Sequence, residues 1–206
     1  DNKIKVVFIE NYDVSKAELI IPAADVSEQI STTTKEASGT GNMKLMMNGA
    51  ITLATLDGAN IEIFDQVGED NIVIFGLSAN EVLNYNKFGG YSALDLYNSN
   101  RVIKRVVDDL VNGFIPNMEK EGRQIYDSLI TYNDEYFVLR DMENYIEAQE
   151  KIDRLYKNKE KWNEMALINI ANSGVFSSDR TIAEYAEDIW FKAVSYTHLT
   201  LPTTPY

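Results

Sequence analysis

The fold of this chain is decided by residues 41–76, which read GNMKLMMNGAITLATLDGANIEIFDQVGEDNIVIFG. Short apolar runs rich in β-branched residues alternate there with runs of helical periodicity, and glycines separate them. The predicted elements are a helix at residues 43–48, a strand at 50–55, a helix at 59–67 and a strand at 71–76. Strands that alternate with helices in this way form a parallel sheet through right-handed crossovers. The stretch therefore predicts a doubly wound, Rossmann-like α/β unit.

A further strand is predicted ahead of this stretch. Residues 5–10 form a nearly continuous apolar run, which is the pattern of a strand buried on both faces, and we interpret them as a central strand. Residues 15–19 predict a helical turn that stops at Pro22, and residues 25–30 lead into a polar loop at 31–36. The first part of the chain thus reads as strand, helix, strand, helix, strand.

The remainder of the chain is predicted to be mainly helical. Apolar residues recur there at helical spacing, which is typical of helices with one face in the core. The three stripes are Val102, Ile103, Val106, Val107, Leu110 and Val111, then Tyr145, Ala148, Ile152, Leu155 and Tyr156, and finally Ile182, Tyr185, Ala186, Ile189 and Trp190. Thr181 and Glu184 have the spacing of a capping box in the last of these helices. We interpret each stripe as core.

The final residues differ in composition from everything before them. Residues 195–206 are dominated by Ser, Thr and Pro, carry no charge and sustain neither period. The string resembles translated vector or sequencing-adapter DNA, and we interpret it as a flexible, non-native tail. It contains His198, the single histidine of the sequence, so no histidine chemistry is expected. The expected organisation is a Rossmann-like cofactor-binding segment at 1–76, a helical part of the same domain at 77–194, and the tail.

The composition limits the classes of partner. The 206 residues carry 32 acidic and 19 basic side chains, a formal net charge of −13, which disfavours nucleic acid and anionic membrane surfaces. No cysteine is present, which excludes disulfides and cysteine-based zinc sites and agrees with a reducing, cytoplasmic location. No apolar run is long enough for a membrane span. We expect no signal peptide, because Asp1, Asn2 and Lys3 are followed at once by a strand-like run, and the start looks cut from a longer protein.

Residues 38–44, which read SGTGNMK, are the segment where chemistry is expected. Glycines let the backbone come close to a ligand, and the free N–H groups and positive dipole end of a helix N-terminus favour a phosphate. Thr40 adds a hydroxyl donor. Lys44 lies in the first turn of the predicted helix, so its amine can act over that turn as a point charge or as a Schiff-base amine. A phosphorylated aldehyde would use both groups.

Spacing alone leaves another use of this segment open. The third glycine of the dinucleotide fingerprint is replaced by Lys44, and the Gly-Lys-Ser/Thr ending of a P-loop is missing, so nucleotide binding is disfavoured. A glycine-rich turn that binds no ligand would have the same spacing. The composition of the segment does not decide between a phosphate site and a structural turn.

A larger set of motifs is more specific. It comprises ENY (10–12), IPAAD (21–25), SEQIS (27–31), EASGTGNMK (36–44), NGA (48–50), TLDGAN (55–60) and FSSDR (176–180). Through these motifs the chain resembles, from Val6 to Trp190, the C-terminal domain of the α-1,4-glucan phosphorylases that act on glycogen, starch and maltodextrin. The resemblance implies one of the two Rossmann-like domains of a GT-B type glycosyltransferase fold, with the catalytic cleft between the domains.

The resemblance implies pyridoxal 5'-phosphate as the cofactor. Lys44 matches the lysine that carries it covalently. Thr40 and Gly41 match the hydroxyl and the backbone N–H that hold its phosphate, which agrees with the chemistry of a helix N-terminus. Tyr12 matches an aromatic residue that lines the cofactor pocket at the end of the first predicted strand, where ligands of parallel sheets bind.

The resemblance also implies a sugar site. Glu36, Ser38 and Gly39 match the groups that hydrogen-bond the hydroxyls of the glucosyl unit at the cleavage point. From the residues alone, Glu36 could instead be a solvated loop carboxylate and Ser38 a helix cap. In the same way, the Tyr12 ring could simply belong to the core.

Other polar residues of this region receive no role in the chemistry. Asp57 stands in an Asp-Gly pair at a strand exit and is interpreted as a turn or cap residue. The acidic residues at 62–70 show no spacing that we can assign to a metal, so no metal site is predicted. Thr33 and Thr34 stand where the family has a small pair, which would change the mobility of the loop and leave the chemistry intact.

The implied reaction is phosphorolysis, in which orthophosphate cleaves the terminal α-1,4 bond of a glucan and glucose 1-phosphate leaves with its configuration retained. The cofactor's phosphate takes part in proton transfer in this family. The resemblance implies a homodimeric protein several times longer than this chain, whose missing part holds the basic residues that grip the substrate phosphate. This fragment alone is therefore expected to be inactive. Two alternatives remain: a nucleotide-sugar glycosyltransferase half-domain and a cofactor-free interaction module.

Overall fold

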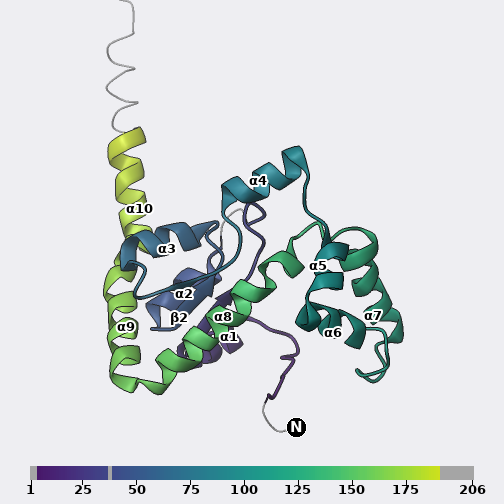
Figure 1. Cartoon of the computed structure of the whole chain (residues 1–206). Helices are drawn as coiled ribbons and strands as arrows, with labels where there is room; N and C mark the ends of the chain where they lie inside the picture. The colour runs from purple at the N-terminus through teal and green to yellow at the C-terminus, as the bar shows by residue number, and fades with distance from the viewer. Residues whose placement is uncertain (1–3, 37–38, 191–206) are drawn as a thin grey trace, which may run out of the picture.

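The computed structural model of the chain describes residues 4–36 and 39–190. A small parallel sheet lies among helices, and a mainly helical part follows it (Figure 1). The strands are β1 (Val26–Gln29), β2 (Ile51–Ala54) and β3 (Val73–Ile74). The α-helices of the described ranges are α1 (Val14–Ile20), α2 (Gly41–Met47), α3 (Ala59–Val67), α4 (Ala79–Phe88), α5 (Ala93–Ser99), α6 (Arg101–Asp109), α7 (Glu119–Tyr126), α8 (Val138–Lys157), α9 (Lys159–Asn172) and α10 (Ser178–Tyr185). Shorter 3-10 or π segments are η1 (Ile21–Ala23), η2 (Asp127–Thr131), η3 (Ser173–Phe176) and η4 (Ala186–Trp190).

The sheet has the order β1-β2-β3, and both pairs of neighbours are parallel. In register, Val26 pairs with Ile51, and Leu53 pairs with Val73. Helix α2 connects β1 to β2, and α3 connects β2 to β3. The mixed α/β class is thereby confirmed, together with the helices predicted at 43–48 and 59–67 and the strands predicted at 50–55 and 71–76, although β3 keeps only two residues of the last strand.

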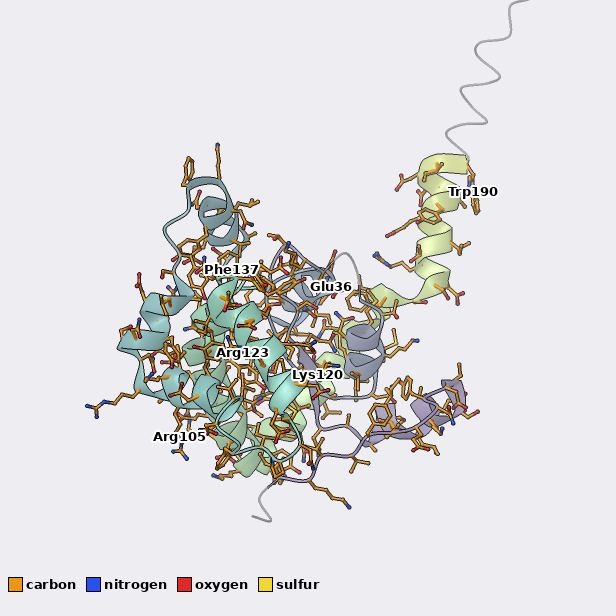
Figure 2. The ribbon with its side chains drawn as sticks, turned by 90° about the vertical axis from the view of Figure 1, so that its right-hand side faces the viewer. Glu36, Arg105, Lys120, Arg123, Phe137 and Trp190 are labelled. Atoms are coloured by element: carbon orange, nitrogen blue, oxygen red, sulfur yellow. The ribbon has the colours of Figure 1, made fainter. Side chains whose placement is uncertain are left out.

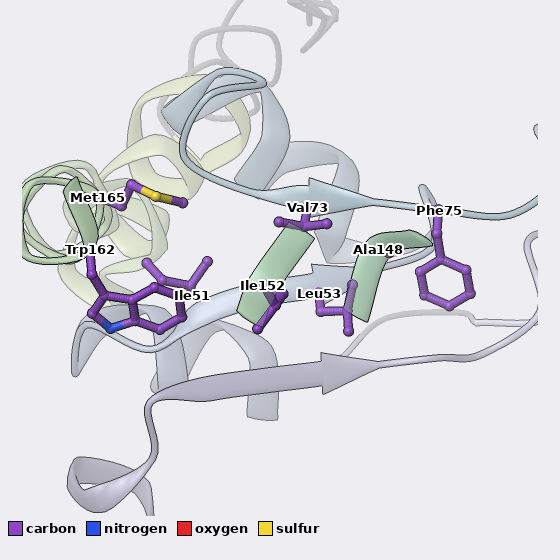
Figure 3. Packing of buried hydrophobic residues seen from close by; sticks show 8 residues of the cluster. All are labelled: Ile51, Leu53, Val73, Phe75, Ala148, Ile152, Trp162 and Met165. Carbon is purple, nitrogen blue, oxygen red and sulfur yellow. The ribbon is translucent and has the colours of Figure 1, made fainter. Parts of the chain in front are cut away.

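Helices cover both faces of the sheet. On one face, Leu53 and Val73 pack against Ala148 and Ile152 of α8 and against the start of α9 (Figure 3). On the other face, Ile74 packs with α2 and α3. Val73 and Ile74 therefore point to opposite faces, as neighbouring residues of a strand must. All four residues of β2 are buried, and three of them are apolar, as expected for a strand that is covered on both faces.

The strand predicted at residues 5–10 is wrong for this structure. Residues 4–9 pair with no strand in the part of the chain that the structure describes, and their side chains are exposed, with Val6 at 90% and Phe8 at 88%. An apolar β-branched run becomes a strand only where a neighbour accepts its backbone hydrogen bonds. None of the described strands lies beside residues 4–9 to accept these hydrogen bonds.

The first strand of the sheet is instead β1, which the sequence analysis treated as a lead into a loop. Its sequence is VSEQ, and three of its four residues are polar. Pairing with β2 satisfies its backbone, and Ser27 is buried by that contact. The carboxylate of Glu28 accepts a hydrogen bond from the Tyr145 hydroxyl of α8 at 3.2 Å. Tertiary contacts thus outweigh the low strand propensity of these residues.

Helix α8 joins the sheet to a helical cluster at the other side of the molecule (Figure 1). Its C-terminal half packs on the sheet, and its N-terminal half contributes Leu139 to an apolar cluster with Ala93, Ile103 and Val107. The prediction that residues 77–194 are mainly helical is confirmed up to residue 190. The stripes of α6 and α8 contribute core residues as predicted, although Val102 and Val106 of α6 are exposed.

The last stripe does not form core among the described residues. Helix α10 and η4 project from the body, with Trp190 near their end (Figure 2). Ile182, Tyr185, Ile189 and Trp190 are all exposed. The predicted capping box is wrong as well, because Glu184 forms an ion pair with Arg180 at 3.1 Å and the helix begins at Ser178. The i,i+4 pair uses the carboxylate that a capping box requires.

The predicted tail at 195–206, with His198, lies outside the described residues, so its expected flexibility stays a prediction. None of the described helices is long and apolar enough to cross a membrane.

Candidate active site

Glu36, at the centre of the predicted sugar site, lies on a loop that leaves the carboxyl end of a strand. The loop at residues 30–36 follows β1, and the turn at residues 55–58 follows β2 and leads into α3. The two segments are joined by the hydroxyl of Thr55, which donates to the carbonyl oxygen of Ser31 at 2.6 Å. Ligands of open parallel sheets bind at this edge.

Glu36 is half-buried and held at three points. Its backbone N–H donates to Oδ2 of Asp57 at 2.9 Å, and Oε2 of its carboxylate accepts a hydrogen bond from the Ser31 hydroxyl at 2.8 Å. Its aliphatic stem lies against Gly58. Oε1 of Glu36 accepts no hydrogen bond from the described residues. One carboxylate oxygen therefore stays available for a ligand hydroxyl.

Gly58 gives Glu36 the room it occupies. Its backbone has φ 52° and ψ −141°, a conformation that side-chain-bearing residues rarely adopt. A Cβ atom on Gly58 would lie 2.9 Å from Cγ of Glu36, well inside van der Waals contact. Both the backbone and the packing at this turn thus require glycine.

Two buried asparagines tie the start of α2 to the start of α3. Nδ2 of Asn42 donates to Oδ1 of Asn60 at 2.8 Å, and Nδ2 of Asn60 donates to the carbonyl oxygen of Thr55 at 3.1 Å. Oδ1 of Asn42 also accepts the backbone N–H of Met43. Gly39 packs on the same side chain, because a Cβ there would lie 3.2 Å from Oδ1 of Asn42. The orientation of the α2 N-terminus is thus fixed from β2 and α3.

The first turn of α2 carries the groups expected to bind the cofactor. Thr40 is the N-cap residue, yet its hydroxyl forms no capping hydrogen bond, and it is exposed. A side chain at Gly41 would meet nothing within 4 Å. The N–H of Lys44 donates to the carbonyl oxygen of Thr40 at 3.2 Å, so Lys44 lies one turn above Thr40 on the same side of the helix.

These residues fit a phosphorylated aldehyde. An uncommitted hydroxyl and free N–H groups at a helix start suit a phosphate, and the exposed Lys44 side chain leaves its amine free of hydrogen bonds and ion pairs with the described residues. Open space beside Gly41 lets a ligand approach the backbone. The donor set of this turn is therefore compatible with pyridoxal phosphate.

A cleft of about 550 Å³ opens beside Glu36. Its walls include Asp57, Gly58 and the first two turns of α3, and Phe176 and Arg180 close it from the C-terminal part of the chain. The charged side chains of this lining are acidic apart from Arg180, and the guanidinium of Arg180 is paired with Glu184. Such a lining suits neutral hydroxyl-bearing groups better than a free phosphate. The cleft includes Met43 of α2, while Thr40, Gly41 and Lys44 lie outside its lining.

An apolar cavity of about 340 Å³ lies at the same edge of the sheet, between the strand ends and α8. Asp141 of α8 borders it and is only 8% exposed. Its Oδ1 accepts the backbone N–H of Leu77 at 2.9 Å. Burial raises the pKa of Asp141 to about 6, although the Leu77 N–H and the charge of Arg140 both act to lower it.

The predicted site residues are only partly brought together. Glu36, Gly39, Thr40, Gly41 and Lys44 follow one another from the strand edge into α2, whereas Ser38 lies outside the described residues.

Tyr12 stands apart from this group. It precedes α1, is 61% exposed, and forms no hydrogen bond or ring contact with any described residue. Its expected place in a cofactor pocket stays a prediction.

The sequence analysis missed the residues that hold the site in place. Ser31, Asp57, Asn42 and Asn60 had no assigned role, or only a local one, because their partners are remote in sequence. A usable signal was the pair of asparagines that stand one or two positions after a glycine at the start of a predicted helix: Asn42 after Gly41, and Asn60 two positions after Gly58. Polar residues at such positions either cap the helix or reach a neighbouring loop.

The fold and this site define a parallel α/β protein whose candidate site lies at the carboxyl ends of its strands, next to a glycine-bearing helix start. The family described as carbohydrate phosphorylase matches residues 1–192, and the chain belongs to that family.

The similar proteins are glycogen phosphorylases. That of Bacillus subtilis (strain 168) is 59% identical over 187 residues, which are 91% of this chain and 23% of the relative. The human liver form is 48% identical over 189 residues, 92% of this chain and 22% of the relative. The human muscle form is 46% identical over the same shares of the two chains. The chain thus spans less than a quarter of the length of these relatives.

Proposed function

We propose that this chain is part of an α-1,4-glucan phosphorylase, which uses orthophosphate to release glucose 1-phosphate from glycogen, starch or maltodextrin. The observation that carries the proposal is the 59% identity, over 91% of this chain, to a protein named glycogen phosphorylase. Family membership and the site's donor groups point in the same direction.

In this proposal, the chain supplies part of one Rossmann-like domain of a GT-B type fold. Residues 1–76 form the cofactor-binding segment, residues 77–194 the helical part of the same domain, and residues 195–206 a non-native tail. The parallel sheet with helices on both faces supports this division. The exposed apolar residues at 4–9 and on α10 support the presence of further protein around them, because large apolar patches of this kind are usually covered.

The first turn of α2 is proposed to hold pyridoxal phosphate. The hydroxyl of Thr40 and the N–H of Gly41 bind its phosphate, Lys44 attaches it covalently, and Tyr12 lines the pocket in the complete protein. When bound, this cofactor supplies a phosphate that serves in proton transfer beside the substrate phosphate. The helix start fixes where that phosphate lies, since its N–H groups are oriented by α2.

Glu36, with Ser38 and Gly39, is proposed to bind the glucosyl unit. The free Oε1 of Glu36 accepts a sugar hydroxyl, while Oε2 stays bound to Ser31. Holding the sugar beside the phosphate cradle lowers the barrier by placing the reacting groups in position. The complete protein is proposed to be a cytoplasmic homodimer that binds neither nucleic acid nor membranes, in agreement with the net charge of −13.

An activity assay on the full-length protein that contains this chain tests the proposal. The protein is incubated with pyridoxal phosphate, an α-1,4-glucan and orthophosphate, and glucose 1-phosphate is quantified. We expect turnover, its loss in Lys44→Ala, and its retention in Lys87→Ala, which removes an exposed lysine of α4. The proposal would be contradicted if the protein released no glucose 1-phosphate but transferred glucose from a nucleotide sugar. It would also be contradicted if the protein catalysed neither reaction.

A further inference from the structure

A side chain of the turn after β2 holds the backbone at the end of the loop after β1. Asp57 Oδ2 accepts the backbone N–H of Glu36 at 2.9 Å, across 21 positions of sequence. The Asp57 N–H bonds the carbonyl oxygen of Thr55 at 3.0 Å, which fixes the aspartate within its own turn. The carboxylate of Asp57 is thus anchored on the sheet and directed at the loop.

Glu36 has little other backbone support. Residues 31–36 form no helix or strand, and Glu36 is followed by residues that lie outside the described part. Among the described residues, the backbone N–H of Glu36 donates its hydrogen bond to Asp57. A charged acceptor makes this bond stronger than one between neutral groups. Without it, Glu36 itself would keep the hydrogen bond from the Ser31 hydroxyl and the packing on Gly58, while the loop before it stays anchored through Thr32 and Thr33.

We infer that Asp57 is a positioning residue for sugar binding: its carboxylate fixes the backbone of Glu36 so that the free oxygen of Glu36 meets a glucosyl hydroxyl. The inference rests on the proposed function of Glu36 and adds a residue that the resemblance did not assign to the site. Asp57 also lines the cleft beside Glu36, yet its contact is with the loop backbone and it acts on the sugar through Glu36.

Two substitutions separate positioning from bulk stability. Asp57→Asn keeps one side-chain oxygen that can accept the Glu36 N–H, whereas Asp57→Ala removes both oxygens. Asp70→Ala is the matched control, because Asp70 is exposed beyond α3 and forms no hydrogen bond or ion pair with the described residues. All variants are made in the full-length protein.

Kinetics provide the first readout. Asp57→Ala is expected to lower kcat/KM for the glucan by about ten- to a hundred-fold, since small displacements of a binding group carry penalties of this size. Asp57→Asn should recover most of the loss, and Asp70→Ala should match the parent. In a Glu36→Ala background, Asp57→Ala should add less than about two-fold, because residues that act through one another are not additive.

Hydrogen exchange provides the second readout. The amide of Glu36 should exchange at least about ten-fold faster in Asp57→Ala than in the parent or in Asp57→Asn, because exchange follows local opening. An unchanged amide, or equal loss of kcat/KM in both backgrounds, would overturn the inference. If Glu36→Ala keeps full activity, the proposed role of Glu36 fails, and the inference falls with it. Loss in Glu36→Ala with no effect of Asp57→Ala would overturn the inference alone.

Discussion

Gly58 shows how one residue shapes the site. It adopts a backbone conformation that suits only glycine, and it leaves the space that the stem of Glu36 fills. Gly68, at the other end of α3, has a comparable backbone, with φ 74° and ψ 165°, but a Cβ there would meet nothing within 4 Å. A substitution at Gly68 therefore tests backbone strain alone, whereas one at Gly58 tests backbone strain together with a steric clash.

We expect Gly58→Ala to destabilise the chain more than Gly68→Ala. Both substitutions force alanine into a disfavoured backbone region, which costs about 1–3 kcal/mol. Gly58→Ala additionally drives its Cβ against Glu36, which adds on the order of 1–3 kcal/mol. Urea unfolding of the two variants measures the difference, and equal losses would show that the Glu36 contact does not constrain this turn.

The buried asparagine pair gives a second residue-scale prediction. Asn60→Ala leaves the buried Nδ2 of Asn42 without its acceptor and removes one of the two donors to the carbonyl oxygen of Thr55, which keeps the Asp57 N–H, so the free energy of unfolding should fall by about 1–3 kcal/mol. Asn84→Ala, in the exposed part of α4, should change it by less than about 0.5 kcal/mol. A loss in Asn60→Ala as small as that of the control would remove this pair from the account of how α2 is held.

At the scale of elements, the sequence pattern predicted the helices, whose hydrogen bonds lie within one segment, better than the strands. Helix α3 begins and ends at the residues predicted from its glycine-flanked periodicity, and α2 begins only two residues early. In contrast, β1 is a strand because β2 pairs with it, and the apolar run at 4–9 is not one because no described strand lies beside it. Pairing partners remote in sequence cannot be read from a strand's own residues.

In the candidate site, too, features formed within one segment could be predicted from the sequence, and contacts between remote segments could not. The proposed phosphate site was predicted from the glycines, the threonine and the lysine of residues 39–44, because those groups would act through a helix start that forms locally. The support of Glu36 by Asp57 and Ser31 depends on two loops meeting, which no single segment encodes. The capping box at Ser78 and Glu81 was overlooked although it is local, and the one predicted on α10 does not form.

Asp141 links α8 to the end of β3 and predicts a pH effect. Burial raises its pKa to about 6, above the value near 3.9 expected when unfolded. The folded state therefore binds this proton more tightly, and the stability that the protonated group contributes is complete below about pH 4 and lost as pH rises through about 6.

We expect Asp141→Asn, which keeps an acceptor for the Leu77 N–H, to gain stability over the parent chain as pH rises. The difference in unfolding free energy between the two should grow by on the order of 1–3 kcal/mol from pH 4 to pH 7. Asp70→Asn, at an exposed position, serves as the control and should show a flat difference. A flat difference for Asp141→Asn would mean that the carboxyl is not held in a desolvated site.

At the scale of the whole molecule, the exposed apolar faces and the limited coverage of the relatives both agree with the proposal that this chain is one part of a longer protein. The apolar residues at 4–9 and on α10 have no covering partner among the described residues, and the chain spans less than a quarter of each glycogen phosphorylase it matches. The cleft beside Glu36 is acidic, and its Arg180 is already paired, so the described residues offer little to bind orthophosphate there.

The isolated chain is accordingly expected to show no phosphorolysis. Supplied with pyridoxal phosphate, a glucan and orthophosphate, the purified 206-residue chain should release no glucose 1-phosphate above background, whereas the full-length protein should release it. Measurable turnover by the chain alone would mean that the phosphate-binding cations lie within these residues.

Lys44 lies one helical turn above Thr40 at the start of α2, and we propose that its amine carries the cofactor there. The most direct measurement is to load the full-length protein with pyridoxal phosphate, reduce it with borohydride and map the modified peptide by mass spectrometry. The account predicts a single label on Lys44, absent from Lys44→Arg. A label on another lysine, or no label in a folded and loaded protein, would contradict it.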